Sequence, residues 1–182
     1  MVRRLLLLTA LLGMSAVVVR ALEGPLSSGA TFPDVPGKTL AGSDITVGMK
    51  DGQAKVFVMT FTKDAAKPAQ AWLDACRADE TAKGASPRVA CWDVRMVEGM
   101  PRLVRGFVEG RMRKDVPVPE RERVVLVYKN NEAWRDRLMV MKDFENDPFL
   151  VLVDRAGRVQ SLLRGPFDAS ALKTEQQKLA AQ

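Results

Sequence analysis

Runs of apolar residues divide this chain into predicted strands and predicted helices. Residues 56–61, 124–128 and 149–153 are almost continuously apolar, which is typical of strands covered on both faces of a sheet. Residues 88–97 alternate instead, with Ala90, Trp92, Val94 and Met96 on one predicted strand face. Residues 159–163 follow a tight turn at 154–158 and are predicted to return antiparallel to the strand before it.

Between these strands, apolar residues recur at the spacing of an α-helix. Residues 65–81 place Ala69, Trp72, Leu73 and Cys76 at helical intervals. Further helices are predicted over 102–114, 130–139 and 167–181, so the element order is β-α-β-α-β-α-β-β-α. Because strands that alternate with helices imply crossover connections, we predict an α/β fold with a central mixed β-sheet and helices on both of its faces.

The N-terminal part of the chain is organised differently. Residues 1–21 combine a basic start, an apolar run and small residues near Ala21, which predicts a secretory signal peptide and an exported, periplasmic or extracellular protein. An uncleaved membrane anchor and a buried helix are the alternatives. Residues 22–52 are rich in Gly, Pro, Ser and Thr, so we predict an extended lead-in with a short hairpin near 39–49. The folded domain is then expected over 53–182.

Composition excludes several kinds of chemistry. The chain contains no histidine, so Ser-His-Asp and Cys-His catalytic arrangements and histidine-ligated zinc sites are excluded. We expect no metal site and no small-molecule cofactor. The net charge of +6 falls to +3 without residues 1–21, which carry Arg3, Arg4 and Arg20. A charge this moderate on an exported protein does not favour nucleic acid as a partner.

Cys76 and Cys91 are the only cysteines of the chain. An oxidising compartment favours a disulfide between them, and the bridge would join a predicted helix to the following strand. Cys76 also lies on the apolar stripe of its helix, so two unpaired core thiols are an alternative. A redox-active pair is the third reading.

Several segments resemble the thioredoxin-like superfamily when they are read in order. Residues 37–45, GKTLAGSDI, resemble the segment ahead of the first core strand in peroxiredoxins and thiol-disulfide oxidoreductases, and residues 147–159, DPFLVLVDRAGRV, resemble their segment around a conserved proline. Four pieces of the chain resemble a narrower group, the mitochondrial ATP-synthase assembly factor family with a thioredoxin-like fold and its exported bacterial relatives. These pieces are RLVRGFV, VPERERVVLVY, DPFLVLVD and LLRGPF.

The resemblance places a degenerate active-site loop after the first core strand. The redox families carry a Cys-x-x-Cys pair there, and this chain instead carries Thr62, Lys63, Asp64, Ala65, Ala66 and Lys67. Asp64 and Lys67 suit the start of a helix, as a cap and a solvated charge; a proton-transfer role for Asp64 would need a raised pKa and a partner. The resemblance also implies a cis peptide bond before Pro148 and a peptide-docking groove beside it.

A basic stretch surrounds the predicted helix 102–114. It includes Arg105, Arg111 and Arg113, which we interpret either as a solvated face or as a surface for an acidic partner or anionic lipid headgroups. Gly106 and Gly110 lie one turn apart in this helix, where glycine is unfavourable. Close packing against the rest of the domain, or against a partner, would explain them.

These observations predict a binding protein rather than an enzyme. By resemblance, it would act as a chaperone or assembly factor for another envelope protein, and that client could be membrane-associated. The alternative is a thiol-disulfide oxidoreductase or peroxiredoxin-like enzyme that uses Cys76 or Cys91.

Overall fold

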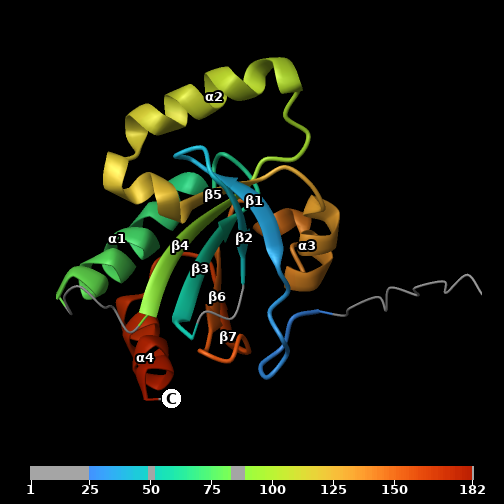
Figure 1. Cartoon of the computed structure of the whole chain (residues 1–182). Coiled ribbons are helices and arrows are strands. Elements are labelled where there is room, and N and C mark those ends of the chain that lie inside the picture. The colour runs from blue at the N-terminus through green and yellow to red at the C-terminus, as the bar shows by residue number, and fades with distance from the viewer. Residues whose placement is uncertain (1–24, 49–51, 83–88, 182) are drawn as a thin grey trace, which may run out of the picture.

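The computed structural model describes residues 25–48, 52–82 and 89–181 (Figure 1). The predicted signal peptide at 1–21 lies outside these residues. Within them, no helix combines the length and the apolar character needed to cross a membrane.

A seven-stranded mixed sheet forms the centre of the molecule, in the order β2-β1-β5-β4-β3-β6-β7. Strands β3 (Ala54–Thr60), β4 (Val89–Met96) and β5 (Val124–Val127) are parallel, whereas β6 (Phe149–Val153) runs antiparallel to β3 and pairs with β7 (Val159–Arg164). Helices α1 (Ala66–Ala82), α2 (Arg102–Asp115), α3 (Asn131–Leu138) and α4 (Ala169–Ala180) connect or follow these strands.

Alternate residues of the central strands build two separate cores. In β3, Val56 and Val58 pack with α1 and α4 on one face of the sheet. Phe57 and Met59 point to the other face, where they pack with α3. All seven residues of β3 are buried, as the continuous apolar run predicts. The α/β architecture with helices on both faces is therefore confirmed.

The N-terminal hairpin belongs to the same sheet. Strands β1 (Val35–Thr39) and β2 (Asp44–Val47) form the predicted hairpin a few residues earlier than expected, and β1 pairs antiparallel with β5. Phe32 of the preceding segment is buried and stacks on Phe57, with 4.6 Å between ring centroids. The predicted domain boundary at residue 53 is thus too late, because this segment completes both the sheet and one core.

Helix α2 takes a different position from the other helices. It lies across the top of the sheet in the view of Figure 1, and it contains no buried residue. Its Met112 packs against a small third core made by Leu40, Val116, Val124 and Leu126. The short 3₁₀ helix η1 (Val118–Arg123) then returns the chain to β5.

Candidate binding groove

A groove of about 610 Å³ lies where β3 and β4 end, between the β3–α1 loop and helix α2. We call it the β3–α2 groove. Its apolar lining comes from the ends of the two strands, from the segment after β4 and from the inner side of α2: Phe61, Met96, Val97, Met100, Val108 and Met112. The carboxyl ends of strands are the usual position for ligands in α/β sheets, so this is the strongest candidate site in the described part of the chain.

The predicted degenerate loop forms one wall of this groove. Thr62, Lys63, Ala66 and Lys67 line it, whereas Ala65 is completely buried. The hydroxyl of Thr62 accepts a hydrogen bond from the backbone N–H of Ala65 (3.2 Å) and donates one to Asn146 Oδ1 (2.7 Å). Thr62 therefore stabilises the turn that leads into α1, a role expected of Asp64.

The rim of the groove carries more positive than negative charge. Lys63, Lys67, Arg95 and Arg111 line it, against Glu98 and Asp115. The guanidinium of Arg95 donates to Asp93 Oδ2 from Nε (3.0 Å) and Nη2 (2.6 Å), and Asp93 is buried. The carboxylate of Glu98 accepts a hydrogen bond from the backbone N–H of Asn131. Both interactions fix charged side chains next to an apolar floor.

The three arginines predicted to bind a partner do not share one surface. Arg105 lies over the ring of Tyr128, 4.6 Å from its centroid, and its Nε donates to the carbonyl of Met100 (3.0 Å). Arg113 donates from Nε to the carbonyl of Leu40 (2.8 Å) and pairs with Glu109 (3.1 Å). Only Arg111 of the three lines the groove. Arg105 and Arg113 instead attach α2 to the domain.

Tyr128 provides a further attachment for α2. Its hydroxyl donates to Glu109 Oε1 at 2.5 Å. Burial raises the pKa of Tyr128 well above its ordinary value, and the hydrogen bond to Glu109 adds to this effect. The phenol therefore stays protonated to a higher pH than an ordinary tyrosine, and its hydrogen bond to Glu109 helps to hold α2 in place as a wall of the groove.

The two cysteines form a disulfide away from the groove. Cys76 and Cys91 are both completely buried, and their Cα atoms are 6.1 Å apart. Cys76 lies about ten residues into α1, which corresponds to about 15 Å of helix beyond the loop. Gln176 of α4 contacts its sulfur (3.6 Å). The bridge joins α1 to β4 inside a core, and it presents no sulfur to the groove.

The prediction of a cis bond before Pro148 is wrong, because the Asp147–Pro148 peptide bond is trans. Pro148 precedes β6, and its carbonyl accepts a hydrogen bond from the backbone N–H of Gly165 (3.1 Å). A trans proline is compatible with this position because the first paired residue of the strand is Phe149. Pro148 also does not line the β3–α2 groove.

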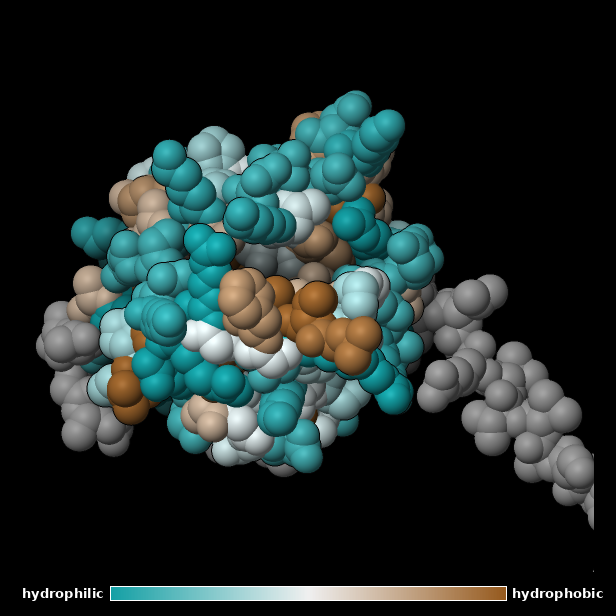
Figure 2. All heavy atoms as spheres, turned by 90° about the horizontal axis from the view of Figure 1, so that it is seen from above, coloured by the Kyte–Doolittle hydropathy of each residue, from teal (hydrophilic) through white to brown (hydrophobic). Residues whose placement is uncertain are grey.

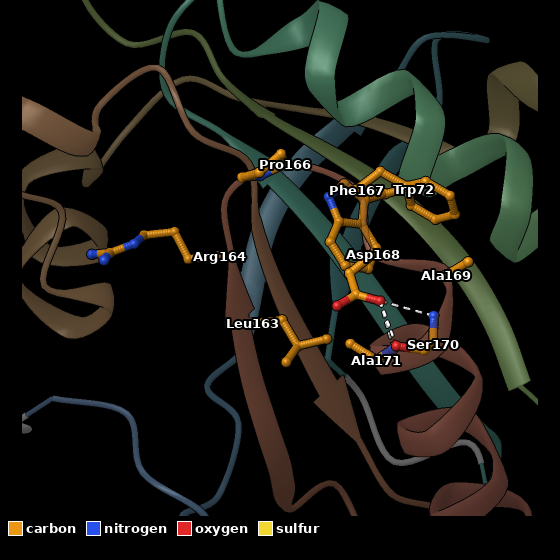
Figure 3. A pocket seen from close by; sticks show the side chains of 9 residues that line it. All are labelled: Trp72, Leu163, Arg164, Pro166, Phe167, Asp168, Ala169, Ser170 and Ala171. Carbon is orange, nitrogen blue, oxygen red and sulfur yellow. Dashed lines mark hydrogen bonds between the residues drawn. The ribbon is translucent and has the colours of Figure 1, made fainter.

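A second cavity, of about 750 Å³, lies at the junction between β7 and α4 (Figure 3). The indole of Trp72 donates to the carbonyl of Gly165 (3.0 Å) and meets the ring of Phe167 edge-on. Asp168 caps α4 by accepting from the N–H groups of Ser170 (2.9 Å) and Ala171 (3.0 Å). The hydrogen bond from Ala171, followed by one from the hydroxyl of Ser170 (2.7 Å), lowers the pKa of Asp168. The polar groups named here already form hydrogen bonds within the domain, so the β3–α2 groove is the better candidate for ligand binding.

Among the described residues, no cluster of acidic or thiol ligands could hold a metal ion.

No model of a known protein family and no curated protein matches this chain. Solved structures do. A thiol:disulfide interchange protein from Bacteroides sp. is 18% identical with a TM-score of 0.54, covering 85% of this chain and 91% of its own. A putative thiol:disulfide interchange protein from Chlorobium tepidum is 16% identical with a TM-score of 0.55, covering 85% and 99%. A secreted thiol-disulfide isomerase from Corynebacterium glutamicum is 11% identical with a TM-score of 0.54, covering 82% and 85%.

These similarities establish the fold of the chain, which is thioredoxin-like. A fold hosts many activities, so function must be argued from the site itself. Sequence reasoning located one wall of that site, the loop at 62–67, and missed the wall supplied by Val108 and Met112. Their spacing of four residues on a predicted helix was the available signal.

Proposed function

We propose that this protein is an exported, non-redox binding protein that holds a polypeptide segment of a client in the β3–α2 groove. One observation carries the proposal: the groove is apolar and rimmed by cations, yet both cysteines of the chain are buried in a disulfide outside it. An apolar groove suits hydrophobic client side chains, and Lys63, Lys67 and Arg111 suit acidic residues beside them.

The role of assembly factor or chaperone for another envelope protein rests on the resemblance described above. Export is supported by the predicted signal at residues 1–21 and by likeness to a secreted isomerase. The competing function, thiol-disulfide exchange, would need an accessible thiolate. Cys76 and Cys91 both have 0% exposure, which argues against it.

Client binding predicts a crosslink from the groove. A photoreactive benzoylphenylalanine in place of Lys67 should form a crosslink to one protein in intact cells. Adding Val108→Asp to the same chain should reduce the crosslinked product about tenfold, because the substitution places a charge in the apolar wall of the groove. Val118→Asp is the matched control, since Val118 is 68% exposed outside the groove and should leave the crosslink intact. No discrete product, or equal loss in both variants, would contradict the proposal.

We also predict that this protein does not catalyse thiol-disulfide exchange. Insulin reduction by dithiothreitol should proceed at the same rate with and without the protein, because no thiol opens α1. A thioredoxin that carries Cys-x-x-Cys serves as the positive control. Turnover that disappears in Cys91→Ser would defeat the non-redox function and establish the enzyme alternative.

A further inference from the structure

The side of α2 that faces away from the domain is apolar, which is unusual for a surface helix. Leu103 is 97% exposed and Phe107, one turn later, is 75% exposed. Gly106 and Gly110 lie on the same side, and a Cβ added at either would meet no atom within 4 Å apart from its chain neighbours and the backbone of its own helix. We call this surface, formed by Leu103, Gly106, Phe107 and Gly110, the α2 ridge. The expectation that the two glycines pack against the domain is therefore wrong.

The orientation of α2 is fixed by its polar side. Glu109 bonds Tyr128 and Arg113, and Arg113 in turn bonds the carbonyl of Leu40. Met112 packs on the third core. These contacts turn the acidic Glu109 toward the domain and leave Leu103 and Phe107 on the outside.

Positive charge accompanies the exposed apolar side chains. Arg102 and Lys114 are exposed at the two ends of α2. A shallow depression of about 500 Å³ over Gly106 and Gly110 is bordered by Phe107, Arg111 and Lys114, with Asp115 as its acidic member. Figure 2, which views the molecule from above, shows hydrophobic side chains gathered on this surface with hydrophilic side chains around them.

We propose that the α2 ridge docks the protein on an anionic lipid surface. Leu103 and Phe107 would enter the interface between headgroups and acyl chains, while Arg102 and Lys114 would meet lipid phosphates. A second copy of this chain is a poor occupant, because two such ridges would bring their cations together. Leu103 and Phe107 are also largely exposed, and a deformable bilayer surface accepts such side chains without a preformed pocket.

The test uses the full chain and places a fluorescent dye on the α2 ridge itself. The signal then reports contact of the ridge with lipid and not membrane binding by the N-terminal apolar segment. The native cysteines are paired and buried, so a cysteine introduced as Leu103→Cys takes up an environment-sensitive nitrobenzoxadiazole dye alone. Met141→Cys, at another exposed apolar position (57%), is the matched control. Vesicles contain either phosphatidylcholine or equal parts phosphatidylcholine and phosphatidylglycerol.

The dye at position 103 should brighten and shift to the blue with vesicles containing phosphatidylglycerol, and the dye at 141 should not change. The double variant Arg102→Glu/Lys114→Glu should raise the lipid concentration that gives a half-maximal dye response by more than about tenfold. Each cation contributes to attraction by the anionic surface. Neither residue lines the β3–α2 groove, so groove binding should survive. No response at 103, an equal response at 141, or an equal response at 103 to vesicles of phosphatidylcholine alone would overturn the proposal.

Discussion

Replacing Trp72 with alanine is expected to lower the free energy of unfolding by about 3–5 kcal/mol, the usual cost of deleting a large buried aromatic side chain. Trp72 is 1% exposed, packs in the core shared by α1 and α4, and donates to the carbonyl of Gly165. Its removal leaves a cavity and an unpaired carbonyl at the junction between β7 and α4 (Figure 3).

Urea and thermal denaturation followed by circular dichroism measure this loss. The melting temperature should fall by about 10 °C for a protein of this size. Trp72→Phe is the control, because it keeps an aromatic ring and deletes the indole donor, so its cost should be clearly smaller. A loss near zero for Trp72→Ala would show that α1 does not depend on this contact.

Removing the disulfide is expected to lower the free energy of unfolding by about 3 kcal/mol, because the bridge closes a short loop in the unfolded chain. The sequence separation between Cys76 and Cys91 is 15 residues, and both side chains are buried in a formed core. The double variant Cys76→Ala/Cys91→Ala should lose this stability. Under conditions where the variant stays folded, the crosslink from benzoylphenylalanine at position 67 should persist.

The matching measurement compares oxidised and dithiothreitol-treated wild-type protein in urea. The reduced protein should unfold at a lower urea concentration, whereas the alanine variant should be insensitive to the reductant. Equal midpoints for the two forms of the wild-type protein would show that the bridge does not support the fold.

The core elements could be predicted from hydrophobic pattern because burial dictates them. The predicted strand at 149–153 coincides with β6, and the helix at 102–114 ends one residue before the observed end of α2. The hairpin at 35–47 was harder, because Pro36, Gly37 and Lys38 give no alternating apolar pattern. Gly37 lies there because a Cβ would come 2.5 Å from the side chain of Val125 and 2.9 Å from the carbonyl of Leu126. This close approach follows from the pairing of β1 with β5, which cannot be read from the sequence.

The site was predictable only in part, for a similar reason. The loop at 62–67 could be located by its place after a buried strand, and Cys76 and Cys91 were open to pairing. The arginines of α2 look alike in the sequence, yet Arg113 bonds Leu40 and Arg111 lines the groove. Pro148 was misjudged because a resemblance supplied the cis geometry and no property of the residues themselves required it.

The absence of a cysteine from the lining of the β3–α2 groove also determines how a bound segment would leave. Thiol-disulfide enzymes hold substrates through a mixed disulfide, which must be resolved by a second thiol. Here no covalent bond of that kind can form, so residence time is set by the dissociation rate alone. For an acidic client segment, Lys63 and Lys67 at the rim would make that rate dependent on ionic strength. In the proposed binding function, release would therefore require no resolving thiol, and it would respond to salt.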